Sequence, residues 1–250
     1  MSQIDIIMPN YNKAPYLEDS IKSIIDQNFS DWNLYIIDDY SSDDSLQILK
    51  KYEKNPKINI IKLKKNKGPS FCRNLGIRLS NSFYIAFIDS DDYWTKNKLR
   101  DQINYMKKNN FHFTYTDFIP FFENKGKKTY LKKTKIKNDF NLKSFCRNTS
   151  INTSTLIIKR EILGHIKFKK LKKLEDYIFK CDILKKYKAI KLNETSAYYR
   201  ILQEGRSGDK FQNIKYLWKL NKKYNKFNFY QNLLSLIFVS YNSFKKYGFK

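Results

Sequence analysis

The sequence predicts an α/β domain with a C-terminal helical extension. Two observations carry this prediction. Between residues 4 and 88, short apolar runs alternate with segments whose apolar residues recur at helical spacing. This β-α-β-α-β-α-β order predicts a Rossmann-like, mostly parallel sheet flanked by helices on both faces. From residue 211 onward the chain is helical in pattern, aromatic and basic.

Four short strands are expected in the first half, and polar or turn-forming residues end each of them. They are Ile4–Met8, Leu34–Ile37, Ile58–Leu63 and Phe83–Ile88. The apolar spacing of residues 17–25 predicts a helix after the first strand. Ser42 or Asp43 can cap a second helix, and Gly68-Pro69 turns the chain into a third.

The second half of the chain is less regular. The expected elements are a helix over 99–106, a strand over 111–118, an exposed hairpin or loop over 120–137, a short strand over 155–158, a helix over 177–184 and an extended segment over 189–199. Two further helices follow, with a break near residues 225–228.

Composition excludes several classes of protein. The 250 residues are 41% hydrophobic, which is ample for one large domain or a domain with an appendage. The three cysteines and two histidines lack metal-ligand spacing, so we expect neither zinc nor disulfides. The net charge of +25 would attract nucleic acid, anionic membrane or phosphorylated substrates. Because the lysines are scattered along the chain, the charge does not indicate a specific partner.

The chain opens directly on a predicted strand, so we expect no signal peptide. No stretch approaches the roughly 20 apolar residues of a membrane span. These observations predict a cytoplasmic protein.

Three carboxylates, Asp89, Asp91 and Asp92, follow the apolar run Tyr84–Ile88 almost side by side. Ligands of open α/β sheets bind beyond the carboxyl ends of the strands, and crowded carboxylates there repel each other without a cation. A hard cation such as Mg²⁺ or Mn²⁺, held together with phosphate oxygens, suits that arrangement. The alternative is that these residues only form a turn and cap the next helix.

Other polar groups also follow the carboxyl ends of predicted strands. They are Pro9-Asn10-Tyr11-Asn12, Asp38-Asp39, Asn66-Lys67-Gly68 and Arg73-Asn74. Each has an ordinary explanation as a loop, a cap or a surface residue. Their shared placement favours a nucleotide site over coincidence.

These motifs, in this order, resemble those of family 2 glycosyltransferases, which have the GT-A fold and use nucleotide-activated sugars. The resemblance covers roughly residues 3–205. It includes Glu175-Asp176, which looks like the family's Glu-Asp motif, and Tyr199-Arg200 followed by Ser207. The layout is most similar to bacterial enzymes of teichuronic acid, capsule and lipopolysaccharide synthesis. Lys169–Lys173 replaces the small or acidic residues usual before Glu-Asp, which obscures the acceptor but not the chemistry.

The resemblance implies a role for each matching residue. The nucleobase and ribose would be bound by the loop of Pro9, Tyr11 and Asn12, together with Asp39, Gly68 and Arg73. Asp89 would contact the ribose or sugar, and Asp91 would ligate Mg²⁺ or Mn²⁺. Glu175 would support acceptor binding, and Asp176 would be the general base. Without the upstream motifs, Glu175-Asp176 is an ordinary acidic helix N-terminus. Arg200 and Arg206 are candidates for pairing with the diphosphate.

A mechanism follows from these roles. A metal at Asp91 would neutralise the leaving diphosphate, and Asp176 would take the proton of the attacking acceptor hydroxyl. One base without a nucleophile implies a single displacement that inverts the anomeric centre. We therefore divide the chain into a catalytic domain at 1–208, with a nucleotide-binding half at 1–95 and an acceptor-binding half at 96–208, and an extension at 209–250. The acceptor would be a saccharide or a lipid-linked sugar.

Two other classes are weighed against this one. A basic nucleic-acid-binding protein would suit the charge and the C-terminal composition, but no helix-turn-helix, zinc or RNP-type signature is present, and no nucleic-acid partner is expected. A nucleotidyltransferase would share the metal carboxylates. It normally has a Gly-rich basic loop after the first strand, which Asn10-Tyr11-Asn12 is not. No dinucleotide or P-loop glycine motif occurs either.

The extension at 209–250 leaves two possibilities open. Its apolar stripe, edged by lysines, is typical of a helix that lies on an anionic membrane surface, which would place the protein peripherally on the inner face of the cytoplasmic membrane. The same stripe would equally suit a helix packed on the catalytic domain.

Overall fold

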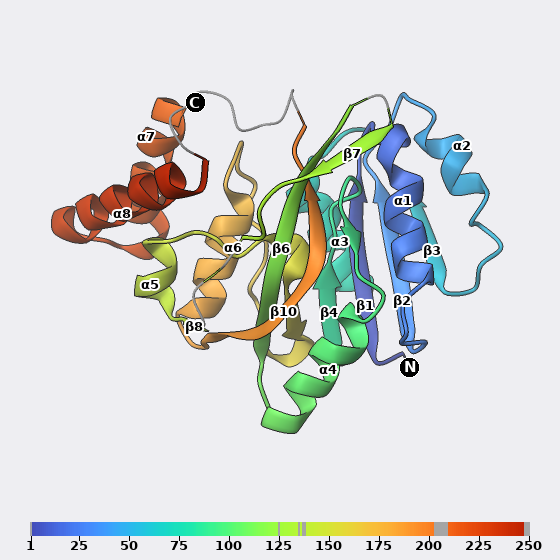
Figure 1. Ribbon diagram of the computed structural model, residues 1–250, viewed down its shortest axis with the longest axis horizontal. Helices are drawn as coiled ribbons and strands as arrows, with labels where there is room; N and C mark the ends of the chain where they lie inside the picture. The colour runs from blue at the N-terminus through green and yellow to red at the C-terminus, as the bar shows by residue number, and fades with distance from the viewer. Residues whose placement is uncertain (1, 125, 135, 137–138, 203–209, 248–250) are drawn as a thin grey trace.

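The computed structural model describes residues 2–124, 126–134, 136, 139–202 and 210–247 (Figure 1). Its strands form one ten-stranded mixed sheet in the order β3-β2-β1-β4-β9-β6-β10-β5, with β7 on β6 and β8 on β10. The strands are β1 (Ile4–Asn10), β2 (Trp32–Asp38), β3 (Ile58–Lys62), β4 (Tyr84–Phe87), β5 (Tyr93–Trp94), β6 (Phe113–Asn124), β7 (Lys127–Tyr130), β8 (Asp139–Phe140), β9 (Ile157–Lys159) and β10 (Ala189–Arg200).

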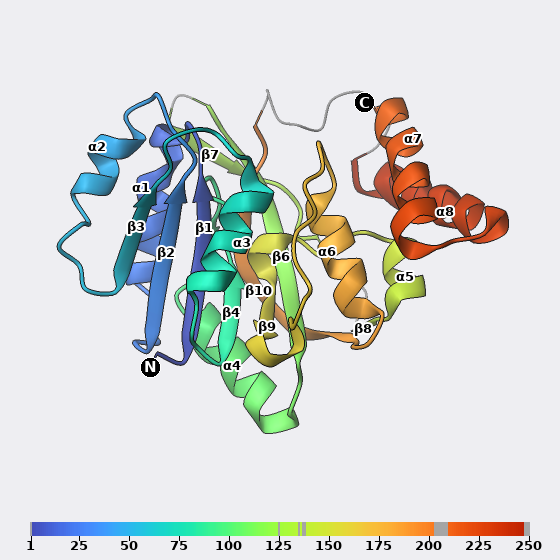
Figure 2. The same ribbon diagram turned by 180° about the vertical axis from the view of Figure 1, so that it is seen from behind.

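Helices cover both faces of this sheet, as the sequence predicts. The α-helices are α1 (Ala14–Ile25), α2 (Ser45–Lys50), α3 (Pro69–Leu79), α4 (Lys98–Asn109), α5 (Leu142–Cys146), α6 (Glu175–Leu184), α7 (Lys210–Leu220) and α8 (Phe229–Tyr247). Figure 1 shows α1 and α4 in front of the sheet, and Figure 2 shows α3 and α6 on the opposite face.

Strands β1 to β4 form the predicted parallel half of the sheet. β1 pairs in parallel with β2 and β4, and β2 pairs in parallel with β3. Ile6, Ile7 and Met8 are fully buried because helices cover β1 on both sides. Gly76 of α3 allows the closest of these contacts, since a Cβ at that position would lie 2.5 Å from Cγ2 of Ile7. This tight packing fixes α3 against the middle of β1.

The second half of the sheet is mixed. β9 runs antiparallel between β4 and β6, while the long strands β6 and β10 are parallel to each other. The predicted strand over 111–118 is longer than expected: β6 continues to Asn124 and forms a hairpin with β7. Thr153–Thr155, at the start of the predicted strand over 155–158, forms a 3₁₀ turn instead. That turn lies against the site described below.

The C-terminal helices pack beside α5 and α6, at the end of the sheet remote from β3 (Figures 1 and 2). α7 buries Leu217 and Leu220, and a π-helical turn over Asn221–Asn225 precedes α8. The predicted break at residues 225–228 therefore lies where the structure ends this turn. The boundary expected at residue 208 falls outside the described residues. Within the described ranges, no helix has both the length and the apolar character needed to cross a bilayer.

Candidate active site

The candidate site lies at the edge of the sheet where β1, β2 and β4 end, opposite the N-terminus of the chain (Figure 2). α3 and the first turn of α6 contribute to it from one face, because Arg73 of α3 contacts Glu175 of α6. Parallel strands bring their carboxyl ends to one edge, so segments far apart in the sequence meet there.

The loops after β1 and β2 are tied to each other by polar contacts. Asp38 Oδ1 accepts hydrogen bonds from Asn10 Nδ2 at 2.8 Å and from Ser41 Oγ at 2.6 Å. Asn12, with a φ of 50°, accepts a hydrogen bond from the amide of Ser42 at 2.8 Å. Tyr11 between them is 46% exposed. The two loops therefore form a fixed frame that presents an open aromatic ring.

Pro9 lies within β1, opposite Ile37 of β2, and so belongs to the sheet that supports this frame. Asp39 and Gly68, both predicted to contact the donor, lie together. The buried Asp39 carboxylate accepts hydrogen bonds from the amides of Lys67 and Gly68, each at 2.7 Å. Gly68 has a φ of 83°, in the left-handed region that favours glycine, and it directly precedes α3. Asp39 thus fixes the loop that leads into α3.

The three carboxylates after β4 have different surroundings. Asp92 is buried and accepts hydrogen bonds from Ser154 Oγ at 2.6 Å and from the amide of Arg200 at 3.0 Å. Asp91 pairs with Lys13, whose Nζ lies 2.9 Å from Oδ2. Asp89 keeps a third of its side chain exposed. Asp92 therefore holds the turn in place, whereas Asp89 and Asp91 face the site.

Repulsion among the carboxylates of this turn is relieved by the Lys13 ammonium beside Asp91. Burial and the neighbouring Asp89 raise the pKa of Asp91, and the ion pair with Lys13 opposes that shift. Burial, together with Asp91 and Asp89, raises the pKa of Asp92 well above its ordinary value. Positive charge at Asp91 relieves this repulsion.

Arg73 connects the turn after β4 to the start of α6. Its Nη2 lies 2.6 Å from Asp89 Oδ1, and its Nη1 lies 3.4 Å from Glu175 Oε1. The guanidinium also lies 5.3 Å from the ring centroid of Phe168, and the residue is only 5% exposed. Burial would lower the pKa of Arg73, but Asp89 and Glu175 outweigh it and raise the pKa. This arginine therefore positions two candidate site residues at once.

Asp176 has a buried cation beside it. Lys180 Nζ lies 2.7 Å from Asp176 Oδ2 and also donates to the carbonyl of Ile151 at 2.7 Å. Thr153 Oγ1 donates to the same carboxylate oxygen at 3.3 Å. Burial alone would raise the pKa of Asp176, but Lys180 and then Arg73 outweigh it, and the pKa is lowered. The carboxylate is thus held ionised and in one orientation.

Arg200 lies behind the carboxylate turn rather than open toward the site. Its side chain is 1% exposed, its Nε donates to the carbonyl of Asp91 at 2.9 Å, and it pairs with Glu123 and Asp19. Pairing with a diphosphate would require this guanidinium to leave those partners, so that role stays a prediction. Arg206 and Ser207 lie outside the described residues.

Several residues at the site were not singled out from the sequence as candidate site residues. Ser154 donates to Asp92 and accepts from the amide of Asp89, while Thr153 contacts Asp176, so one 3₁₀ turn orders both ends of the site. Lys180 carries a recognisable signal, since it follows Asp176 at the i,i+4 spacing of a helical ion pair. Lys13 had none, because only the fold brings it to Asp91.

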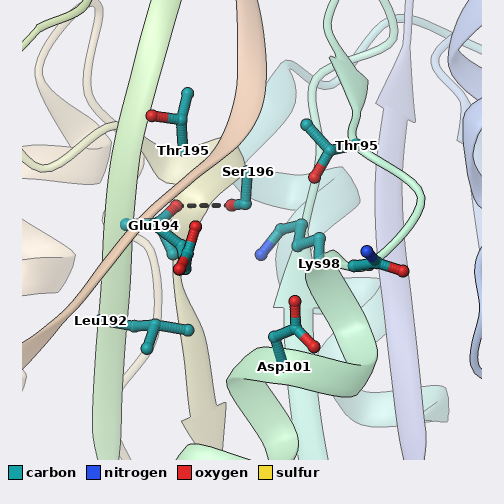
Figure 3. Close-up of a pocket in the computed structure, with 9 residues that line it drawn as sticks. Thr95, Lys98, Asp101, Leu192, Glu194, Thr195 and Ser196 are labelled. Carbon is teal, nitrogen blue, oxygen red and sulfur yellow. Dashed lines mark hydrogen bonds between the residues drawn. The ribbon is translucent and has the colours of Figure 1, made fainter.

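Among the described residues, no group of three or more His, Cys, Asp or Glu side chains is arranged to hold a metal ion. A separate polar cavity of about 220 Å³ lies between α4 and β10 (Figure 3). Figure 3 shows the Lys98 side chain pointing into it, with Asp101 and Glu194 nearby. None of the predicted site residues lines this cavity.

Comparisons with known proteins agree with this geometry. Residues 5–167 match the family model described as Glycosyl transferase family 2. The chain is 29% identical to Bacillus subtilis TuaG, named provisionally as a teichuronic acid biosynthesis glycosyltransferase, over 97% of this chain and 96% of TuaG. It is 31% identical to Escherichia coli WfgD, a UDP-Glc:alpha-D-GlcNAc-diphosphoundecaprenol beta-1,3-glucosyltransferase, over 86% of this chain and 83% of WfgD.

Among solved structures, S. aureus TarS 1–349 in complex with UDP-GlcNAc matches with a TM-score of 0.72 and 19% identity, over 98% of this chain and 76% of that chain. At this identity the likeness shows a common fold.

Proposed function

Because this chain belongs to glycosyltransferase family 2 and has the GT-A fold, we propose that it is an inverting enzyme that transfers a sugar from a UDP-sugar. The observation that carries this proposal is one line of charged contacts. It runs from Asp89, beside the candidate metal ligand Asp91, through Arg73 to Glu175, the neighbour of the candidate base Asp176. Donor and acceptor chemistry would thus meet at one edge of the sheet.

The nucleotide would bind over the loops after β1 and β2. The exposed ring of Tyr11 is free to stack on the uracil, with Pro9 and Asn12 shaping its loop. Asp39 has used one lone pair of each carboxylate oxygen on the amides before α3 and keeps capacity to accept from the base or ribose. The complex of TarS with UDP-GlcNAc supports this choice of donor.

The carboxylates after β4 fit a divalent metal that the donor helps to hold. The Lys13 ammonium lies 2.9 Å from the Asp91 carboxylate, and the neighbouring Asp89 is close enough to raise the pKa of Asp91. One or two carboxylates together with diphosphate oxygens are the usual ligands of Mg²⁺ in such sites, so three protein ligands are not required. When bound, Mg²⁺ or Mn²⁺ supplies charge neutralisation for the leaving diphosphate.

Asp176 would act as the base on the acceptor hydroxyl. Lys180 and Thr153 hold Oδ2, and 36% of the side chain is exposed, so the carboxylate can reach a bound acceptor. Glu175 starts the same helix and would help to bind that acceptor. The proposed roles assign one base and no covalent nucleophile, so the transfer would be a single displacement with inversion.

The acceptor would be a saccharide or a lipid-linked sugar in cell-surface polysaccharide synthesis, at the inner face of the cytoplasmic membrane. The activity in the name of WfgD, on a diphosphoundecaprenol-linked sugar, supports this class of acceptor. Family membership disfavours the nucleic-acid-binding and nucleotidyltransferase alternatives.

A donor screen tests the proposal. UDP-, GDP- and dTDP-sugars would each be incubated with the enzyme and Mn²⁺, and sugar release would be measured with and without chelator. We expect hydrolysis of a UDP-sugar that chelator removes, and a thermal shift with UDP plus Mn²⁺ but none with single-stranded DNA. Equal shifts with DNA and no donor hydrolysis would overturn the assignment.

A further inference from the structure

Helix α8 buries two polar side chains, whereas most of its described apolar side chains are exposed and only Leu236 and Val239 are half-buried against the core. Asn232 and Ser235 are each 1% exposed, although both are polar. The outward residues are between 39% and 74% exposed, and they are Phe229, Tyr230, Leu233, Leu234, Ile237, Phe238 and Tyr241. A surface helix of a globular protein normally shows the opposite arrangement.

Specific hydrogen bonds hold α8 in this orientation. Ser235 Oγ donates to the carbonyl of Cys146 in α5 at 2.6 Å. Asn221 Nδ2 donates to Asn232 Oδ1 at 3.2 Å and to Ser235 Oγ at 3.1 Å. Tyr177 of α6 donates to Asn221 Oδ1 at 2.6 Å. Rotating α8 to bury its apolar face would break these bonds, so the exposure of that face is built into the packing.

We infer that the outward face of α8 docks on an anionic lipid bilayer. Lys222, Lys223 and Lys226 are exposed immediately before the helix, and the sequence has no charged residue between Lys226 and Lys245. An uncharged apolar face next to exposed lysines matches the layers of a membrane interface, with acyl chains beside anionic headgroups. Tyr230 and Tyr241 near the two ends of the face suit the boundary between these layers.

Charge also decides between a bilayer and a second copy of the chain. A net charge of +25 repels another copy but attracts anionic lipid. The exposed lysines would gain opposite charge from anionic lipid headgroups, whereas a second copy carries twice as many basic as acidic residues.

The inference deepens the proposed function and rests on it for the identity of the acceptor. α8 is joined through Asn221 to Tyr177, which follows the candidate base Asp176 in α6. Docking α8 on lipid would therefore bring the acceptor side of the site near the membrane, where a lipid-linked sugar is presented. The sequence left open whether 209–250 binds a membrane or packs on the catalytic domain. In the structure the two helices differ, because α7 buries Leu217 and Leu220 whereas α8 exposes most of its apolar residues.

Vesicle sedimentation tests the inference. The full chain would be mixed with phosphatidylglycerol–phosphatidylcholine vesicles and, separately, with phosphatidylcholine alone, at low and high salt. The test variant is Leu234→Glu with Ile237→Glu, both at exposed positions. The control is Phe83→Glu, which removes an even more exposed apolar residue just before β4.

We expect the wild type and Phe83→Glu to sediment with the anionic vesicles, and the double variant to bind at least about tenfold more weakly. High salt should release the wild type. Failure of the wild type to sediment, or equal binding by the double variant, would overturn the inference. So would a wild-type dimer that the double variant converts to monomer, because the face would then contact a second copy. Donor hydrolysis, assayed without vesicles, tests the proposed function independently.

Discussion

Lys180 lies one helical turn after Asp176 and places its ammonium 2.7 Å from Oδ2 of that carboxylate. The lysine side chain is 3% exposed, whereas that of the aspartate is 36% exposed. The pair therefore consists of a buried cation and a partly open anion. A helical ion pair on a free surface contributes little, but this one fixes the orientation and the charge of the candidate base.

Replacing the base by its amide tests its role directly. Asp176→Asn keeps the size of the side chain and its place at the start of α6. We expect donor binding to persist and transfer to fall by roughly 10²–10⁴-fold, the usual loss for a general base. Single-turnover assays with calorimetric donor binding would measure both. Normal turnover per folded molecule would show that Asp176 is not the base and serves only to stabilise the N-terminus of α6.

The pH profile tests Lys180. In the wild type the lowered pKa of Asp176 keeps the base ionised, so the acidic limb of kcat, measured with saturating donor and Mn²⁺ to keep Asp91 ionised, should lie below the ordinary aspartate value of 3.8. Lys180→Met removes the attraction and leaves burial, which raises that pKa, so the limb should move to higher pH.

A control for this variant lies directly after the same helix. Lys185→Met breaks the ion pair between Lys185 and Asp182 at the end of α6 and should leave the profile in place. An unmoved limb in Lys180→Met would show that Lys180 acts only in packing.

Asp91→Ala should abolish transfer and metal-dependent binding of UDP. The fold should survive, because removing one anion from three neighbouring carboxylates relieves repulsion. Calorimetry of UDP with and without Mn²⁺ measures the first effect, and thermal unfolding measures the second. Asp31→Ala, an exposed aspartate before β2, is the control. Metal-dependent UDP affinity that is unchanged in folded Asp91→Ala would remove Asp91 as the ligand.

Arg73→Met should destabilise the protein, because it leaves Asp89 and the buried Glu175 without their shared cation. Loss of one partner from a buried pair typically costs about 3–5 kcal/mol. Urea unfolding measures the change, and Glu175→Gln added to Arg73→Met should restore part of it. A change within about 0.5 kcal/mol, as at ordinary surface sites, would contradict the bridging role.

Lys98 predicts a distinct pH dependence of stability. Burial lowers its pKa from 10.5 to about 7. Between these values the unfolded chain holds a proton that the folded chain lacks, so stability rises with pH by up to about 1.4 kcal/mol per unit. Below about pH 7 both states are protonated and this contribution is lost. The wild type should show this rise relative to Lys98→Met in unfolding experiments from neutral to alkaline pH; parallel curves would contradict it.

The sequence by itself determined the parallel half of the sheet and the identity of most candidate site residues. Apolar runs such as Ile4–Met8 specify buried strands locally, and crossover helices between them require parallel pairing. Asp39, Gly68, Asp89 and Asp91 could be assigned to one edge for the same reason, since strand ends of a parallel sheet coincide. Only local pattern and general topology were needed.

Tertiary structure alone decided how these residues divide their work. The three aspartates after β4 look equivalent in sequence. In the structure, however, Asp92 is buried and accepts a hydrogen bond from Ser154, whereas Asp91 pairs with Lys13. Arg200 follows a recognisable motif, yet its guanidinium is enclosed by Glu123 and Asp19. By sequence, the apolar residues of α8 suited a buried helix and a membrane-bound helix equally well. In the structure, hydrogen bonds of Ser235 and Asn232 fix the orientation of the helix. The physical reason is common to all three: burial, and the partner that accompanies it, depends on contacts between residues far apart in the chain, which no local pattern encodes.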